Sequence, residues 1–211
     1  MRITKLGHCC LVIEEAGVRV MTDPGAWSTL QSEAKDINYV FITHEHQDHL
    51  HIESLKTVLK NNPAAKVVTN RSVGKLLEKE GISFELLEHG DAREFVGVHV
   101  EGCGEKHEVI YESFGQVQNT GYFFAKRFFY PGDAFTHPKR PVEILALPVC
   151  GPWMKISDAL EYAKALKPKH AFPVHDGMLK IHGPFHAIPQ ALLQKEGIVF
   201  EPLREGDSKE F

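Results

Sequence analysis

The chain has 211 residues, of which 43% are hydrophobic and 25% are charged, so it has the composition of a globular protein and enough length for one hydrophobic core. Its formal net charge is only −4, which does not favour a nucleic acid as partner. No apolar run approaches the roughly 20 residues that a membrane-spanning helix requires. We therefore expect a soluble protein that binds neither nucleic acid nor membrane.

The amino terminus and the cysteines indicate a reducing compartment. Residues 1–7 contain one basic residue, Arg2, and no apolar core of the kind found in a signal peptide. The four cysteines form no Cys-x-x-Cys pair and no disulfide framework for a core of this size. We expect reduced thiols and a cytoplasmic location.

The first elements in chain order are short strands. Residues 3–5, 9–13 and 18–22 are predicted strands, and residues 15–17 form the turn of a hairpin. Residues 39–42 are apolar throughout, a pattern typical of a strand that is buried on both faces. The chain therefore begins as an antiparallel sheet and continues with a buried strand.

A strand, helix, strand unit follows. Apolar residues at helical spacing predict a helix that ends at residues 61–63, and residues 66–69 form a β-branched strand. Ser72 is a predicted N-cap of a second helix, which Gly81 closes. Apolar alternation then predicts a strand over residues 95–100. This alternation of strands and helices indicates an α/β protein.

The second half repeats this kind of pattern without repeating the sequence. Further strands are predicted at residues 122–125, 128–130, 144–147, 170–174 and 198–200. Further helices are predicted at residues 156–166 and 187–193. With no linker or low-complexity segment in between, residues 1–203 form one predicted domain. Residues 204–211 are expected to be a polar tail without regular structure.

Four potential metal ligands crowd into six residues directly after the buried strand 39–42. They are His44, His46, Asp48 and His49. Imidazole and carboxylate groups are common metal ligands, and a loop at a strand end can turn several of them toward one point. Solvated loop residues would show this crowding only by accident. The sequence therefore predicts a metal-binding loop.

Two further candidates also follow apolar strands. Asp133 comes after residues 128–130, through Gly132, which allows a tight turn, and His175 directly follows residues 170–174. Because ligands converge at the carboxyl ends of strands in open α/β sheets, residues far apart in sequence can share one pocket there. We expect both side chains to join the loop at residues 44–49.

A third imidazole is predicted to come from His107, which lies in the loop after the strand that ends near residue 100. His99 is a rival candidate. It lies inside an alternating strand, where its side chain belongs to one face of the sheet. We therefore prefer His107 to His99.

These donors suit two metal ions. Three imidazoles leave a fourth tetrahedral position for water, as in catalytic zinc sites. Two metals about 3.5–4 Å apart can hold a shared hydroxide, and a metal can lower the pKa of bound water from about 15.7 to about 7. The predicted ligands are His44, His46 and His107 for the first metal and Asp48, His49 and His175 for the second, with Asp133 as the bridge. The hydroxide is the predicted nucleophile, and Asp48 orients it.

Residues 43–49 resemble the His-x-His-x-Asp-His signature of the metallo-β-lactamase superfamily. Asp23 resembles the early Asp of that family, and the order of His107, Asp133 and His175 agrees with its later motifs. The resemblance implies a four-layer αβ/βα sandwich with the metals at one edge. It also implies that Asp23 supports the ligand loop from behind.

A narrower resemblance rests on residues 6–8, on residues 147–149 and on Pro152 and Trp153. These positions are similar to the L-ascorbate-6-phosphate lactonase-like branch of metal-dependent hydrolases. The resemblance implies a supporting role for His8 behind the metal ligands. It does not carry over the lactonase activity, because members of the branch differ in substrate.

The predicted function is a metal-dependent hydrolase that acts on a small-molecule ester, lactone or phosphoester. Two divalent metal ions are the predicted cofactors, with zinc favoured by affinity and manganese or iron by availability. A non-catalytic metal-binding or regulatory module is one alternative. A diiron redox protein is another, and His46 argues against it, because such relatives replace one histidine by a carboxylate. The sequence does not specify the substrate, the oligomeric state or the group that protonates the leaving group.

Overall fold

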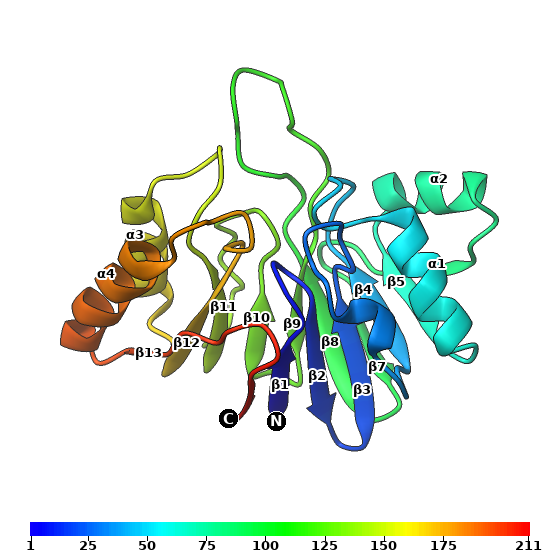
Figure 1. Cartoon of the computed structure of the whole chain (residues 1–211), viewed down its shortest axis with the longest axis horizontal. Helices are drawn as coiled ribbons and strands as arrows, with labels where there is room; N and C mark the ends of the chain where they lie inside the picture. The colour runs from blue at the N-terminus through cyan, green and yellow to red at the C-terminus, as the bar shows by residue number, and fades with distance from the viewer.

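Two sheets of seven strands each form the centre of the protein in a computed structural model that describes residues 1–211 (Figure 1). In order across the first sheet lie β14 (Ser208–Glu210), β1 (Arg2–Lys5), β2 (Leu11–Glu15), β3 (Val18–Thr22), β4 (Tyr39–Ile42), β5 (Lys66–Thr69) and β6 (Phe84–Leu86). In order across the second sheet lie β13 (Val199–Phe200), β12 (His170–Val174), β11 (Ile144–Pro148), β10 (Phe128–Tyr130), β9 (Gly121–Phe124), β8 (Val98–Cys103) and β7 (Ala92–Phe95).

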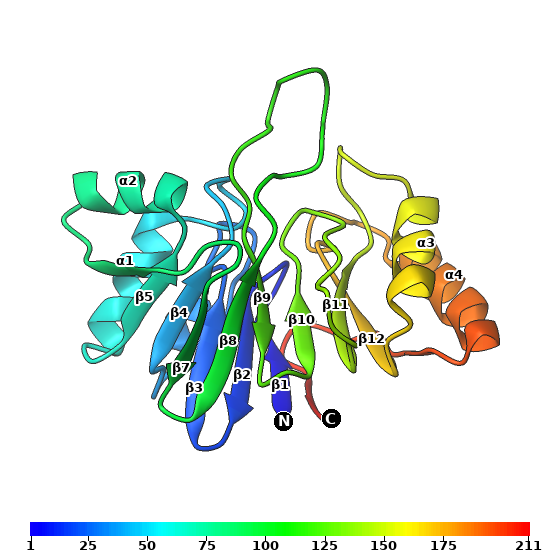
Figure 2. The ribbon, with the colours of Figure 1, turned by 180° about the vertical axis from the view of Figure 1, so that it is seen from behind.

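Helices cover the outer face of each sheet. Figures 1 and 2 show α1 (Ile52–Asn61) and α2 (Arg71–Lys79) on the side of the first sheet, and α3 (Ile156–Leu166) and α4 (Gly183–Leu193) on the side of the second. Two short 3₁₀ helices, η1 (Gln31–Glu33) and η2 (Gln194–Glu196), complete the elements. The layers run helix, sheet, sheet, helix, so the predicted αβ/βα sandwich is confirmed.

Aromatic side chains fill the space between the two sheets. The ring of Phe41 lies 5.0 Å from Tyr122 and 5.2 Å from Phe124, and Phe128 stacks on Phe172 at 5.9 Å. Successive residues of a strand point to opposite faces, so the neighbouring Phe123 belongs instead to the cluster beneath α3. Each sheet is thus buried on both faces, as the continuous apolar runs of β4 and β10 indicate.

Parallel pairing brings several strand ends to one edge. β3, β4 and β5 are parallel neighbours in the first sheet, as are β10, β11 and β12 in the second. The loops that follow β4, β10 and β12 therefore meet at the upper edge in Figure 1. These are the loops that carry the predicted metal ligands.

The predicted cap of the second helix is wrong. Asn70, and not Ser72, is the N-cap of α2, and its side chain accepts a hydrogen bond from the backbone nitrogen of Val73 at 3.1 Å. The same side chain donates to the backbone oxygen of Thr43 at 2.7 Å. Asn70 therefore ties the start of α2 to the histidine-rich loop, a contact between separate segments that helix-end patterns do not reveal.

The predicted strand over residues 95–100 is interrupted by a turn. Val96 and Gly97 have φ angles of 49° and 86°, and the chain reverses there so that β7 pairs with β8 in antiparallel fashion. Gly97 tolerates positive φ without a steric penalty, which explains the position of the turn. Apolar residues continue to alternate on both sides of this turn, so the sequence pattern alone did not reveal it.

The expectation of an unstructured tail is also wrong. β14 pairs antiparallel with β1 and forms the edge of the first sheet. The backbone nitrogen of Phe211 donates to the oxygen of Met1 at 2.8 Å, and both ends of the chain lie side by side in Figure 1. A polar strand at a sheet edge has no apolar alternation, so local sequence does not predict it.

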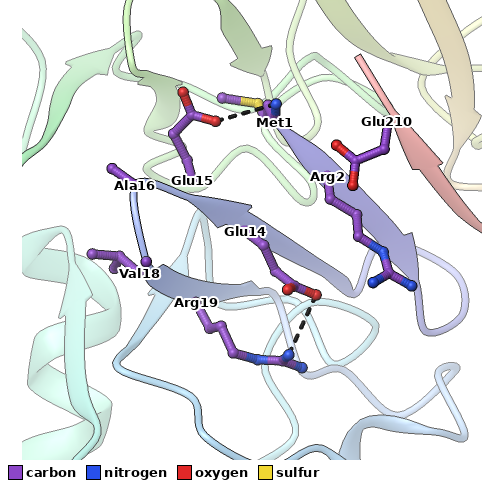
Figure 3. Close-up of a pocket in the computed structure, with 9 residues that line it drawn as sticks. Met1, Arg2, Glu14, Glu15, Ala16, Val18, Arg19 and Glu210 are labelled. Carbon is purple, nitrogen blue, oxygen red and sulfur yellow. Dashed lines mark ion pairs between the residues drawn. The ribbon is translucent and has the colours of Figure 1, made fainter.

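A shallow cavity of about 480 Å³ lies beside these chain ends (Figure 3). Two ion pairs border it, between the Met1 amino group and Glu15 and between Arg19 and Glu14, each at 3.3 Å. It lies at the start of β1 and β3, so it is at the opposite end of the strands from the histidine-rich loops. No helix in the protein has the length and apolar character needed to cross a membrane.

Candidate metal centre

All seven predicted ligands lie together at one edge of the sandwich. The loops that carry them follow β4, β8, β10 and β12. Within each of two groups, the potential ligand atoms lie within 4.8 Å of one another. The first group is His44, His46 and His107, and the second is Asp48, His49, Asp133 and His175. The structure thus brings together residues that are up to 131 positions apart (44 to 175).

The first group contains only imidazoles. The ring of His46 lies 4.8 Å from that of His44 and 4.6 Å from that of His107. His44 and His107 are buried, whereas His46 is half-buried. The group is therefore open to solvent on the side of His46.

Asp133 lies between the two groups. Its Oδ2 is 3.3 Å from His107 Nε2 and 2.9 Å from His175 Nε2, and its Oδ1 is 3.1 Å from His49 Nε2. Gly132 precedes it with a φ of 66°, and a Cβ there would lie 2.3 Å from the Asn119 side chain. A glycine is thus required at this turn, as the sequence indicated.

Hydrogen bonds behind the rings set their tautomers. His44 Nδ1 lies 3.0 Å from Thr43 Oγ1, and His49 Nδ1 lies 2.7 Å from Asp23 Oδ2. His107 Nδ1 donates to a backbone oxygen. When Nδ1 carries the proton, Nε2 is the free donor atom, which is the usual arrangement of a metal-bound histidine.

Several of these atoms lack a hydrogen-bond partner although they are buried. They are His44 Nε2, His49 Nε2 and Asp133 Oδ1. Buried polar atoms in folded proteins are nearly always hydrogen-bonded, because an unpaired one loses its interaction with water. Buried electron-pair donors in both groups that form no hydrogen bond fit bound cations. The donor set, of nitrogen and carboxylate oxygen, fits a divalent transition metal.

Protonation differs between the two groups. Burial and the neighbouring His49 hold the pKa of His44 well below its ordinary value, and burial together with His107 lowers the pKa of His46. For His175, burial lowers the pKa, but the carboxylate of Asp133 outweighs it and the pKa is raised. For Asp133, burial raises the pKa, but His175 and His49 outweigh it and hold the pKa well below its ordinary value.

Asp23 fixes the ligand loop from behind. Its carboxylate accepts hydrogen bonds from the backbone nitrogen and the hydroxyl of Thr43, from His49 and from the Tyr130 hydroxyl, each at 2.7 Å. Asp23 is fully buried and has a φ of 36°. The predicted placement behind the ligands is what the structure shows, and Tyr130 is an additional partner.

His8 lies behind the second group. Its Nε2 is 3.2 Å from Asp48 Oδ2, and its Nδ1 accepts a hydrogen bond from the backbone nitrogen of Gly177 at 3.0 Å. Its backbone oxygen accepts one from the backbone nitrogen of His175 at 3.1 Å. His8 thus contacts one potential ligand directly and positions the loop of another.

Two residues at this centre were not predicted as site residues. Trp153 Nε1 donates to Asp133 Oδ2 at 3.0 Å, and Cys9 lies within 4.8 Å of donor atoms of His8, His49 and His175. Trp153 stands among the positions of the narrower family resemblance, which is the one signal that pointed to it. Cys9 carried no signal.

His99 lies outside the centre, where its ring nitrogens are 2.7 Å from Glu94 and 3.0 Å from Glu101. The choice of His107 over His99 therefore agrees with the structure. Cys103 ends β8, and burial with the charge of Glu101 raises its pKa to about 11, which makes it a poor nucleophile.

Comparison with known proteins is consistent with this geometry. The family model of the beta-lactamase superfamily domain matches residues 2–175. The chain belongs to the beta-lactamase superfamily. The narrower resemblance to the L-ascorbate-6-phosphate lactonase-like branch stays a prediction.

Individual relatives of this superfamily member differ in coverage. Protein Rv0786c of Mycobacterium tuberculosis is 32% identical over 184 residues, which is 85% of each chain. A UPF0173 metal-dependent hydrolase of Flavobacterium johnsoniae is 33% identical over 100 residues, which is 45% of this chain and 43% of the relative. Igni18, a metallo hydrolase from Ignicoccus hospitalis, is 20% identical with a TM-score of 0.79 and covers 100% of this chain and 98% of its own. This last likeness shows the shared fold.

Proposed function

We infer that this member of the beta-lactamase superfamily is a metal-dependent hydrolase. The observation that carries the inference is the set of buried, unpaired donor atoms on His44, His49 and Asp133, because it fits a metal at the edge where strand ends converge. The hydrolase name of its UPF0173 relatives supports the same reaction class.

The residues would hold two divalent ions. His44, His46 and His107 would bind the first, Asp48, His49 and His175 the second, and Asp133 both. When bound, the metals would polarise the substrate oxygen and supply a shared hydroxide at neutral pH as the nucleophile. Zinc fits these nitrogen and oxygen donors best by affinity, with manganese or iron as alternatives set by availability.

The protein's own groups orient the reaction. His8 Nε2 lies 3.2 Å from Asp48 Oδ2, and because His8 Nδ1 accepts a hydrogen bond from Gly177, this Nε2 donates to the carboxylate and holds it in place to bind metal and orient the hydroxide. Trp153 Nε1 donates to Asp133 Oδ2 at 3.0 Å and orients this second carboxylate. We propose a small ester, lactone or phosphoester as the substrate.

The test combines metal analysis with a substrate screen. Purified protein is analysed for zinc, manganese and iron and for flavin absorbance, then assayed against a panel of lactones, p-nitrophenyl esters and phosphodiesters. We expect His46→Ala and Asp133→Ala each to lower metal content and to reduce kcat/KM by more than about a hundredfold, because changes behind metal ligands already cost about 10–100-fold.

His99→Ala is the matched control, since this histidine lies outside the centre and its loss should leave activity intact. Full activity in the His46→Ala and Asp133→Ala variants would place the chemistry elsewhere. An iron and flavin spectrum would instead favour redox chemistry.

A further inference from the structure

Apolar side chains gather on the edge that carries the metal centre. Six of the eleven large apolar side chains that are exposed lie in loops at this edge. We call these six residues the apolar rim. They are Trp27, Val109, Tyr111, Phe114, Met178 and Ile181. Exposed apolar side chains cost little singly, but a group of them around a polar centre marks a surface that binds something apolar.

The rim is continuous with the metal centre. The ring of Trp27 lies 5.0 Å from that of His8, and Met178 directly follows Gly177, whose backbone nitrogen bonds His8. The ring of Trp153 lies 5.8 Å from both His107 and His175. Apolar rings thus lie directly beside His8 and beside the predicted ligands His107 and His175. Pockets for small ligands have this composition, with few polar groups among apolar walls.

The β8–β9 loop supplies the most exposed part of the rim. In Figures 1 and 2 it projects furthest from the sheets, above the edge of the metal centre. Its base is held by hydrogen bonds from His107 to Val117 at 2.9 Å and from Asn119 to Glu105 at 3.3 Å. Its tip is a tight turn in which Tyr111 and Phe114 are 70% and 73% exposed.

The base of this loop is part of the metal centre. His107 lies in it, and the backbone nitrogen of Glu108 donates to the oxygen of Asp133 at 2.9 Å. Tyr111 is four residues from His107, so their Cα atoms are at most about 14 Å apart. A substrate with an extended apolar group can therefore contact the metals and the loop tip together.

We propose that the substrate carries an alkyl or aryl group beside its scissile bond and that the apolar rim binds this group. The proposal rests on the proposed function, because it names the substrate class of the same site. Each methylene that the rim buries should tighten binding about fourfold when burial is complete. Affinity for a homologous series should therefore rise with chain length.

Binding of reaction products tests the proposal without turnover. The two tryptophans of the chain, Trp27 and Trp153, both lie at the metal centre, so intrinsic fluorescence reports binding. Zinc-loaded protein is titrated with acetate and with hexanoate, which has four additional methylenes. We expect hexanoate to bind at least about tenfold more tightly, since partial burial gives only part of the full increment.

The variant Tyr111→Ser/Phe114→Ser removes the loop tip, and Val96→Ser is the matched control. Val96 is 72% exposed but lies in the β7–β8 turn at the opposite edge. We expect the ratio of hexanoate affinity to acetate affinity to fall at least about fourfold in the double variant, which is the effect of one buried methylene. The affinity for acetate should not change. The control should keep the preference.

Equal binding of the two acids, or a preference that the double variant retains, overturns the proposal. It is also overturned if sedimentation shows a dimer that the double variant dissociates, because a second copy would then cover the rim. Absence of any metal-dependent hydrolysis would instead contradict the proposed function, while the ratio of affinities would still report on the rim.

Discussion

At the scale of single residues, Asp176 shows how a buried charge is held beside the metal centre. Its Oδ1 lies 2.6 Å from Lys5 Nζ, and its Oδ2 lies 2.9 Å from His186 Nε2. Burial raises the pKa of this carboxyl, but the hydrogen bond from His186 and the charge of Lys5 outweigh it and hold the pKa below its ordinary value. Lys5 and Asp176 are both buried, so each depends on the other for neutralisation.

We expect Asp176→Asn to lower the free energy of unfolding by about 3 kcal/mol at pH 7, because it leaves the Lys5 charge unpaired. A carboxyl with a lowered folded pKa stabilises the protein above its unfolded pKa of about 3.9 and loses this contribution as pH falls through the folded value. The difference in the free energy of unfolding between wild type and Asp176→Asn should therefore be largest at neutral pH and should shrink as pH falls below about 4. Urea unfolding of metal-free protein from pH 3 to 8 measures it. Asp36→Asn, at an exposed position, should change nothing, and a difference that does not shrink as pH falls from 5 to 3 would contradict the assignment.

Asp23 leads to a prediction on metal binding. Asp23→Asn replaces one acceptor oxygen by a donor, so either Thr43 or His49 loses its partner. We expect affinity for the second metal to fall about 10–100-fold, because the His49 ring is no longer oriented. Competition with a chromophoric chelator measures the affinity, and circular dichroism checks the fold. Unchanged affinity would show that the loop is positioned without Asp23.

At the scale of elements, the loop after β4 depends on a close backbone approach. A Cβ on Gly25 would lie 1.8 Å from the backbone oxygen of Asp48. We expect Gly25→Ala to push this loop outward, which should cost about 1–3 kcal/mol and weaken metal binding. Thermal unfolding and metal analysis test this. Gly183→Ala is the control, because a Cβ at Gly183 meets nothing within 4 Å. If Gly25→Ala and Gly183→Ala had the same thermal stability and metal content, the proposed clash would be excluded.

Strand ends explain why so much of the candidate centre was predictable. His44, Asp133 and His175 each follow an apolar run, and parallel strands deliver their ends to the same edge. Both the order of the elements and the place of the centre follow from such local patterns. The Asn70 cap does not follow from local patterns, because the side chain also donates a hydrogen bond to Thr43, at the end of a neighbouring strand.

Contacts between distant segments explain what was missed. Trp153 reaches Asp133 from a loop 20 residues away, and the indole hydrogen bond has no sequence pattern. β14 is a strand because β1 offers it an open edge, and its own three residues carry no apolar alternation. Likewise, the turn at Val96 was hidden because apolar alternation ran through it.

At the scale of the whole molecule, β14 closes the edge of the first sheet. Deleting residues 208–211 removes its pairing with β1 and the packing of Phe211 against Phe172. We expect a loss of about 1–3 kcal/mol, since Phe211 is only partly buried and full removal of a buried Phe costs about 3–5 kcal/mol. Urea unfolding measures the loss, and Glu210→Ala, which keeps the backbone bonds, is the control. Metal affinity should not change, because this strand ends at the edge far from the metal centre. If the truncated protein unfolded at the same urea concentration as wild type, the strand would add no stability.

The neighbouring chain ends also bear on synthesis in the cell. β1 is made about 200 residues before its partner β14. At roughly 5–20 residues per second, β1 therefore keeps one row of unpaired backbone groups for about 10–40 s while the rest of the chain is translated. An open strand edge can pair with another nascent chain. On crowded polysomes, the speed of elongation through the second half should therefore govern how much of this protein aggregates before release.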